Sequence, residues 1–232
     1  MAGGASRLVS TAVTQSGPVA VVPVGASAVA YNVTVVGTTG AGHLRVMPGG
    51  VASTSTSAVN WSVAGERIAN GSVVAVDPQR RIRVFNGGGL PVRFLIDVVG
   101  YYSGSGAQFF AVDPVRTTDT RVVSGGAGPV VPVGVRAVST AVSAVGGFGV
   151  VPVGASAVAF NATVVRTGSL GHLRVFPADE GLPTASLLNW PGAGSTRANA
   201  SVVGVSPARE VRVYNGASTP TDVLIDINGY YK

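Results

Sequence analysis

A stretch of sequence that occurs twice constrains this chain more than any other feature. The residues Val-Val-Pro-Val-Gly-Ala-Ser-Ala-Val-Ala stand at 21–30 and again at 150–159, and the two prolines are 152 − 23 = 129 positions apart. The same interval relates matching residues over nearly the whole of both copies, without an insertion or deletion. An interval this long, present twice, indicates a duplicated domain rather than a solenoid of small units.

The segment that joins the two copies has no counterpart in the first one. It opens with Ser-Gly-Ser-Gly at 103–106, which is typical of a linker. Phe109–Arg121 follows, and its aromatic and charged residues favour ordered structure. We therefore expect two homologous domains, at 1–103 and 104–232, with Phe109–Arg121 in the second and the equivalent front segment missing from the first.

Within each copy, apolar residues alternate with small or polar ones at a period of two, as in Val29, Tyr31 and Val33. This period is typical of β-strands with one buried face. Pro, Gly and Asn separate the alternating runs and predict turns between them. The expected strands lie near 8–14, 27–36, 43–47, 56–61, 68–76, 81–86 and 92–101, with equivalents 129 residues later. The sequence thus predicts an all-β chain of two tandem antiparallel β-sandwiches of a jelly-roll-like kind.

Composition excludes several kinds of chemistry. Cysteine is absent, which removes disulfides, thiolate catalysis and cysteine-ligated metal clusters. Charged residues make up 11% of the chain and the net charge is +6, without the clustered Lys and Arg that nucleic-acid binding requires. No apolar run suits a transmembrane helix, and the first residues do not resemble a signal peptide. We expect no cofactor, no metal, no nucleic-acid partner and no membrane span.

The candidates for ligand binding are matched between the two copies. A Trp beside a Gly/Pro-rich loop can stack on a sugar ring or pack in the core, and Asn can bind a polar ligand or satisfy a turn. His and Arg at solvent-facing strand positions form either a basic stripe for an anionic polymer or a solubilising surface. The candidates are Trp61, Trp190, Asn60, Asn189, His43, His172, Arg45, Arg174, Arg83 and Arg212.

No pattern for catalysis accompanies these residues. The histidines fall in different copies, the Gly-x-Ser-x-Gly elbow is absent, and only Asp97 and Asp226 are acids in both copies. A shared two-carboxylate mechanism therefore fails, and we expect no enzymatic activity. Asp97 and Asp226 each stand inside an apolar run, where an unpaired carboxylate is costly. We expect an arginine or backbone amides to satisfy each of them.

A set of motifs in the second copy suggests a family. They are Phe110-x-x-x-Pro114-x-Arg116-x-x-Asp119-Thr120-Arg121, Asn161-Ala162-Thr163-Val164, Gly171-His172-Leu173-Arg174-Val175 and Asp226-x-x-Gly229-Tyr230-Tyr231. Together they resemble a β-rich repeat at the C-terminal ends of large secreted actinobacterial proteins. The resemblance implies an extracellular or cell-surface accessory role and carries over no catalytic residues. The first copy departs from the pattern because it lacks the Pro-x-Arg-x-x-Asp-Thr-Arg segment, which predicts an exposed or borrowed edge strand there.

These observations lead to two hypotheses for function. The first is a non-catalytic extracellular module that binds a cell-wall polymer or polysaccharide, including an anionic one, and anchors a larger secreted protein. Duplication favours this hypothesis because two weak sites acting together give avidity. The alternative is a structural stalk or a self-assembling surface or filament subunit without a ligand. The charge-poor surface and the missing front segment favour this alternative.

Overall fold

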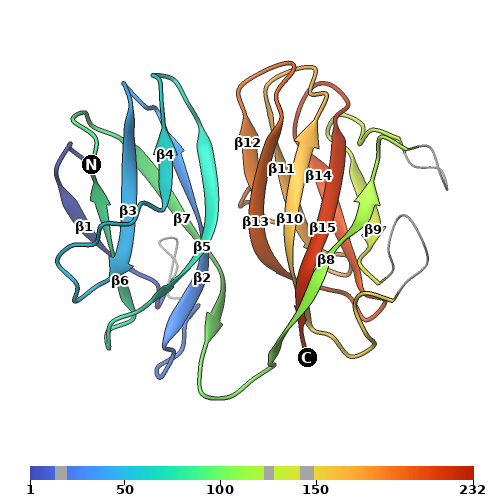
Figure 1. Cartoon of the computed structure of the whole chain (residues 1–232), viewed down its shortest axis with the longest axis horizontal. Coiled ribbons are helices and arrows are strands. Elements are labelled where there is room, and N and C mark those ends of the chain that lie inside the picture. Colours follow the sequence, from blue (N-terminus) through green and yellow to red (C-terminus); the bar gives the residue numbers. More distant parts are fainter. Residues whose placement is uncertain (14–19, 123–127, 142–148) are drawn as a thin grey trace. The chain divides into compact units, whose positions relative to one another are not determined.

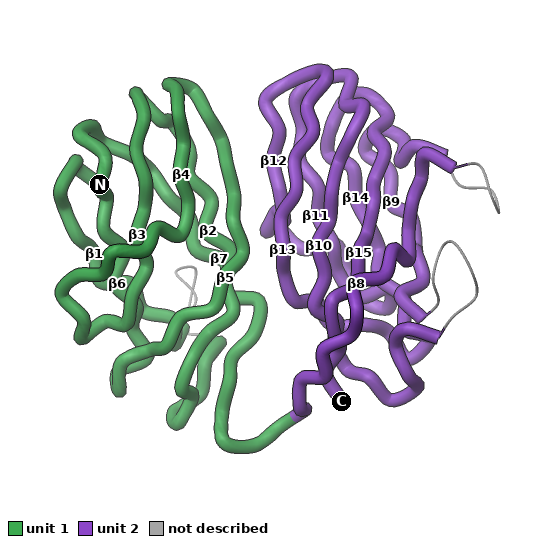
Figure 2. Tube along the Cα trace, viewed as in Figure 1, with its two compact units in different colours: residues 1–106 green, residues 107–232 purple. Residues whose placement is uncertain are grey.

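The chain consists of strands, turns and loops, and the structure contains no helix among the residues it describes (Figure 1). This computed structural model describes residues 1–13, 20–122, 128–141 and 149–232. Two compact units divide the chain, Met1–Gly106 and Ala107–Lys232 (Figure 2). Within the described ranges, no helix is long and apolar enough to cross a membrane.

Unit 1 is a two-layer sandwich of antiparallel strands. Its strands are β1 (Ser6–Ser10), β2 (Ala28–Val36), β3 (Gly42–Pro48), β4 (Val59–Trp61), β5 (Ile68–Ala75), β6 (Arg81–Asn86) and β7 (Arg93–Tyr102). One sheet has the order β1-β6-β3-β4, and the other has the order β5-β2-β7. Both sheets contribute to one core, in which Val33, Leu44 and Ile82 are fully buried.

Unit 2 repeats this arrangement with one more strand. Its strands are β8 (Phe109–Asp119), β9 (Val135–Ser139), β10 (Ala157–Val165), β11 (Gly171–Pro177), β12 (Leu188–Trp190), β13 (Arg197–Gly204), β14 (Glu210–Asn215) and β15 (Asp222–Tyr231). The sheet orders are β9-β14-β11-β12 and β13-β10-β15-β8. Leu173, Val213 and Ile225 lie in its core, and Val112 and Val115 of β8 pack against that core. The predicted all-β sandwich class is confirmed.

Strand pairing in unit 2 is nested. The first strand pairs with the last, β8 with β15, and then β9 with β14, β10 with β13, and β11 with β12, all antiparallel. Eight strands in two sheets joined in this way form a jelly roll. Unit 1 has the three inner pairs, β1 with β6, β2 with β5, and β3 with β4. Among its described residues, β7 pairs only with β2, so its outer edge has no strand.

Strand bounds in the two units differ by the interval seen in the sequence. β2 begins at Ala28 and β10 at Ala157, and β7 ends at Tyr102 and β15 at Tyr231. Both differences are 129, from 157 − 28 and from 231 − 102. The jelly-roll architecture therefore recurs at the interval of the sequence repeat.

Two predicted strands of the first copy differ from those observed. The strand expected at 8–14 lies at Ser6–Ser10, and position 14 of that prediction is outside the described residues. The strand expected at 56–61 is shortened to Val59–Trp61. The Ser- and Thr-rich residues before Val59 bond with one another instead of joining a ladder, as the 3.1 Å contact between the Thr54 and Thr56 hydroxyls shows. Short hydroxyl side chains compete with strand pairing in this way.

Candidate functional site

The basic side chains of β3 and β6 in unit 1 bind the unit's own loops. Arg45 Nη1 donates to the carbonyl of Thr54 at 2.8 Å, and Arg45 Nε donates to His43 Nε2 at 3.1 Å. The same guanidinium lies over the Phe85 ring, 5.4 Å from its centre. Arg83 Nη2 donates to the carbonyl of Gly49 at 3.0 Å. Arg45 and Arg83 therefore hold the loop that follows β3 against the sheet.

Unit 2 uses its matching residues in the same way. Arg174 Nη1 donates to the Pro183 carbonyl at 2.7 Å, and its guanidinium lies 5.2 Å from the centre of the Tyr214 ring. The His172 ring is 6.0 Å from Tyr214. Arg212 Nη1 lies 3.5 Å from the Glu180 carbonyl, at the long limit of a hydrogen bond. The same loop is thus fastened in both units by arginine.

Both tryptophans lie in the cores. Trp61 is 6% exposed and Trp190 is 2% exposed, and Trp190 Nε1 donates to the Ser169 carbonyl at 2.7 Å. Glycines at 42 and 171 make room for the rings, because an added Cβ would lie 2.6 Å from Trp61 Cζ2 at the first position and 2.5 Å from Trp190 Cζ2 at the second. Neither indole offers a face on which a sugar could stack. The core-packing alternative describes both residues.

The candidate asparagines are held by neighbouring serines. Asn60 Nδ2 donates to Ser57 Oγ at 3.0 Å, and Asn189 Nδ2 donates to Ser186 Oγ at 3.1 Å. Asn60 is exposed, whereas Asn189 is 6% exposed. Each amide therefore braces the turn that precedes a short strand, which is a common use of asparagine.

A second pair of arginines holds another loop in each unit. Arg80 and Arg209 occupy left-handed turn positions, with φ of 58° and 61°. Arg80 Nη1 donates to the Val22 carbonyl at 2.8 Å, and Arg209 Nη1 donates to the Val151 carbonyl at 2.9 Å. Both arginines therefore fix the repeated Pro-Val-Gly segment of their own unit.

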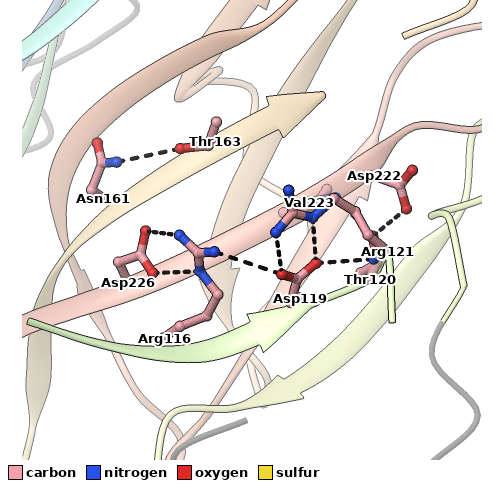
Figure 3. Close-up of polar contacts among 9 residues, drawn as sticks. All are labelled: Arg116, Asp119, Thr120, Arg121, Asn161, Thr163, Asp222, Val223 and Asp226. Atoms are coloured by element: carbon pink, nitrogen blue, oxygen red, sulfur yellow. Dashed lines mark hydrogen bonds and ion pairs between the residues drawn. The ribbon is translucent and has the colours of Figure 1, made fainter. Parts of the chain in front are cut away.

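The densest polar cluster lies where β8 pairs with β15 (Figure 3). Arg116 of β8 makes a two-pronged contact with Asp226 of β15, from Nε to Oδ1 at 2.8 Å and from Nη2 to Oδ2 at 3.1 Å. Arg116 Nη1 is also 3.6 Å from Asp119 Oδ2. Hydrogen bonding to Asp226 raises the pKa of Arg116.

Further contacts secure the far end of β8. Thr120 Oγ1 donates to Asp222 Oδ1 at 2.8 Å and accepts from the Val223 amide at 2.8 Å. Arg166 Nε pairs with the other Asp222 oxygen at 2.9 Å. Sequence reasoning missed Thr120, Asp222 and Arg166. The available signal was a departure from the repeat, because the first copy has Arg93 and Gly37 where the second has Asp222 and Arg166.

Asp119 closes this end of the cluster. Arg121 Nε and Nη2 donate to its two oxygens at 2.9 and 2.6 Å, and the Arg121 amide donates to Oδ1 at 3.1 Å. Hydrogen bonding from the Arg121 side chain lowers the pKa of Asp119, and its desolvation opposes the shift only in part. The Asp119–Arg121 pair is therefore charged at neutral pH.

The two matched acids differ in their surroundings. Asp226 has the arginine partner that the sequence predicts, supplied from 110 positions away in the chain. Asp97 occupies the equivalent position of β7, and among the described residues no side chain pairs with it. Burial raises the pKa of the Asp97 carboxyl. The expectation of a satisfying arginine or amide is thus wrong for Asp97, because no strand in the described part of the chain supplies β7 with the arginine that β8 supplies to β15.

The comparisons with known proteins add little to this geometry. No family model and no curated protein matches the chain. One solved structure that matches is a chain of Sulfolobus turreted icosahedral virus, with a TM-score of 0.24 and 9% identity over 98% of this chain and 86% of that chain. A likeness this distant carries no argument. Within the described ranges, no group of three or more His, Asp or Glu side chains could hold a metal ion.

Proposed function

We propose that this chain is a non-catalytic structural module, a stalk or assembly subunit built from β-sandwich units. One observation carries the proposal: the side chains that could have formed a ligand site bind carbonyls and rings of their own unit. Arg45 and Arg174 each hold a loop and stack on an aromatic ring. An arginine used in this way contributes to stability through packing as well as charge.

The conserved geometry between the two units also supports a structural role. The loop-fastening contacts of Arg45 and Arg80 recur 129 residues later in Arg174 and Arg209, with donor-to-acceptor distances that agree within 0.1 Å. Repetition of a brace is expected where each unit must hold its own fold. An extracellular or cell-surface location is part of the proposal and rests on the sequence resemblance.

Co-sedimentation tests this proposal against the anchoring hypothesis. The full chain is spun with bacterial cell walls and with insoluble polysaccharides over a salt series, and light scattering follows the same samples. A structural module sediments no more with walls or polysaccharides than it does alone, whether or not light scattering shows that it forms multimers. Saturable binding that weakens with salt would overturn the proposal and support anchoring to an anionic polymer.

Matched substitutions separate bracing from binding. Arg45→Met and Arg174→Met remove the charge and keep most of the length of the side chain. Arg67→Met is the control, because Arg67 is exposed and is not one of the arginines that hold these loops. If the arginines brace loops, the first two variants unfold at lower denaturant concentration and Arg67→Met does not. If the first two instead keep wild-type stability and lose binding to walls, the proposal is wrong.

A further inference from the structure

The two units differ most at one edge, the outer edge of β7. In unit 2 the equivalent strand, β15, pairs with β10 on one side and β8 on the other. In unit 1, β7 pairs with β2, and no other strand among the described residues lies against it. A sheet edge of this kind presents a row of unpaired backbone amides and carbonyls that can pair with another strand.

Side chains of β7 are more exposed than their counterparts in β15, because no described strand pairs with the outer edge of β7. The core-facing side chains of β15, Val223, Ile225 and Ile227, are at most 1% exposed. Their counterparts in β7 are Phe94, Ile96 and Val98, and all three are only partly buried. Unit 2 covers this side of its core with Val112 and Val115 of β8. Unit 1 has the apolar residues for such a contact without the strand that would cover them.

Gly100 leaves open the space that a paired strand occupies in unit 2. At the equivalent Gly229, an added Cβ would lie 2.5 Å from Phe109 Cζ and 2.7 Å from the Phe110 carbonyl oxygen, so glycine is needed for β8 to pack. At Gly100, an added Cβ would meet no atom within 4 Å. Glycine weakens a strand unless something approaches its backbone closely. Unit 1 therefore has space beside Gly100 for an aromatic ring like that of Phe109 in unit 2.

The shape of the β7 edge selects the strand that fits it. The ladder of β7 with β2 is irregular between Val98 and Gly100, as is that of β15 with β10 between Ile227 and Gly229. Irregular edges resist pairing with ordinary flat strands. β8 matches this irregularity in unit 2, because its residues 112–114, which include Pro114, span the same interval. A strand that pairs with β7 must be irregular in the same way.

Charge defines the occupant further. Arg116 of β8 pairs with Asp226, and Asp97 stands at the equivalent place in β7 without a cation. Thr120 bonds to Asp222, whereas β7 has Arg93 at that position. A strand for β7 therefore needs an arginine opposite Asp97 and gains from an acid beside Arg93. In unit 2, Asp222 receives Thr120 of the chain's own β8.

We propose that the outer edge of β7 binds an extended segment of a partner polypeptide, antiparallel and of the β8 type. This segment carries an aromatic residue over Gly100, a proline-containing bulge, an arginine that pairs with Asp97 and an acidic residue near Arg93. It completes the jelly roll of unit 1 by adding the strand that unit 2 contains. A second copy's β7 matches this edge less well than a β8-type segment, because β7 has no proline for the bulge and carries its one arginine, Arg93, at its first position.

A synthetic peptide of residues 107–122, added to the full chain, tests the proposal. We expect saturable binding in calorimetry and slower amide exchange along β7. Asp97→Asn in the chain, or Arg116→Ala in the peptide, should weaken binding at least tenfold, since each removes one half of a two-pronged charged contact. Asp226→Asn is the matched control and should leave peptide binding unchanged. A peptide of reversed sequence controls for composition.

The acidic position provides a second readout. A peptide with Thr120→Asp should bind several-fold more tightly than the parent peptide, and Arg93→Asp in the chain should reverse that order. A gain from Thr120→Asp that does not depend on Arg93 would contradict the assigned register. This comparison uses binding strength alone and does not depend on changes in folding.

If the free peptide binds too weakly to detect, the same segment can be joined covalently to the chain. Met1 and Val92 exchange backbone hydrogen bonds at 2.7 and 3.0 Å, as Val130 and Thr221 do at 2.8 and 3.1 Å in unit 2. Residues 107–129 joined directly before Met1 would therefore precede Met1 as they precede Val130 in unit 2. The graft should protect β7 from exchange and raise the unfolding midpoint of unit 1, and Asp97→Asn should cancel part of that gain.

Three results would overturn the proposal. Failure of both peptide and graft to protect β7 shows that the edge does not accept such a strand. Loss of peptide binding in Asp226→Asn but not in Asp97→Asn shows that the chain's own β8 occupies β7. A concentration-dependent dimer with β7 protected in the absence of peptide shows that a second copy is the occupant.

Discussion

β7 of unit 1 and β15 of unit 2 are equivalent strands with different neighbours. Both end in Gly-Tyr-Tyr, and both carry an aspartate in the middle. Leu224 of β15 is 4% exposed, whereas the equivalent Leu95 of β7 is 50% exposed. Tyr230 of β15 stacks on Phe110 with ring centres 5.3 Å apart, whereas the equivalent Tyr101 of β7 is 49% exposed. The comparison shows that one strand, β8, converts an exposed edge into part of the core. Similar sequences thus acquire different surfaces because of a segment outside the repeat.

Both units bury one tryptophan in the core, and replacing it tests this shared feature. Trp61→Ala and Trp190→Ala should each lower the free energy of unfolding by about 3–5 kcal/mol, because a large buried ring leaves a cavity. Denaturant titration followed by circular dichroism measures this loss. Unchanged stability in either variant would show that its indole is not packed in solution as it is in the structure.

Glycine-to-alanine substitutions should have opposite effects in the two units. Gly229→Ala forces a Cβ against Phe109 and should destabilise unit 2 by about 1–3 kcal/mol through overpacking. Gly100→Ala meets open space and should stabilise unit 1 by about 0.4–1 kcal/mol, since alanine restricts the unfolded chain. Amide exchange resolves the two units. Equal destabilisation by both substitutions would mean that β7 is already covered.

The matched aspartates sharpen the same contrast. Asp226→Asn should cost about 1–2 kcal/mol in unit 2, because it breaks a two-pronged contact with Arg116 that is partly open to solvent. Asp97→Asn should cost almost nothing, because it removes a carboxylate that has no cation partner. A double-mutant cycle with Arg116→Ala measures the coupling. Coupling between Arg116 and Asp97 would show that β8 pairs with β7 of unit 1 in solution, which would contradict the structure.

The smallest expected difference between the units is in how much stability each loses at low pH. The pKa of Asp77 is lowered: desolvation acts to raise it, and hydrogen bonds from Arg81 and from the Gln79 amide outweigh that effect. A depressed folded pKa gives stability that is present above the ordinary value of 3.8 and is lost as the pH falls below it. Unit 2 has Ser206 at this position. Asp77→Ser should therefore reduce the loss of unit 1 stability between pH 5 and pH 2, as measured by denaturation midpoints.

The strands were the most predictable part of the molecule. Alternation and turn residues located most of the strands to within a residue or two, because a half-buried strand imposes a period of two on its own sequence. The candidate site was less predictable. Whether Trp61 faces a sugar or the core depends on Gly42 and on the opposite sheet, and neither is visible in the Asn-Trp pair.

The sequence alone determined the repeat interval, the all-β class and the ordered character of Phe109–Arg121, because each of these is written in local composition and spacing. Only the tertiary structure showed that this segment pairs with β15 as β8 and that Asp226, rather than Asp97, receives Arg116. Partners 110 residues apart in the chain meet only once the nested strand pairs have formed. The choice between two equivalent aspartates therefore depends on long-range pairing, which local sequence does not encode.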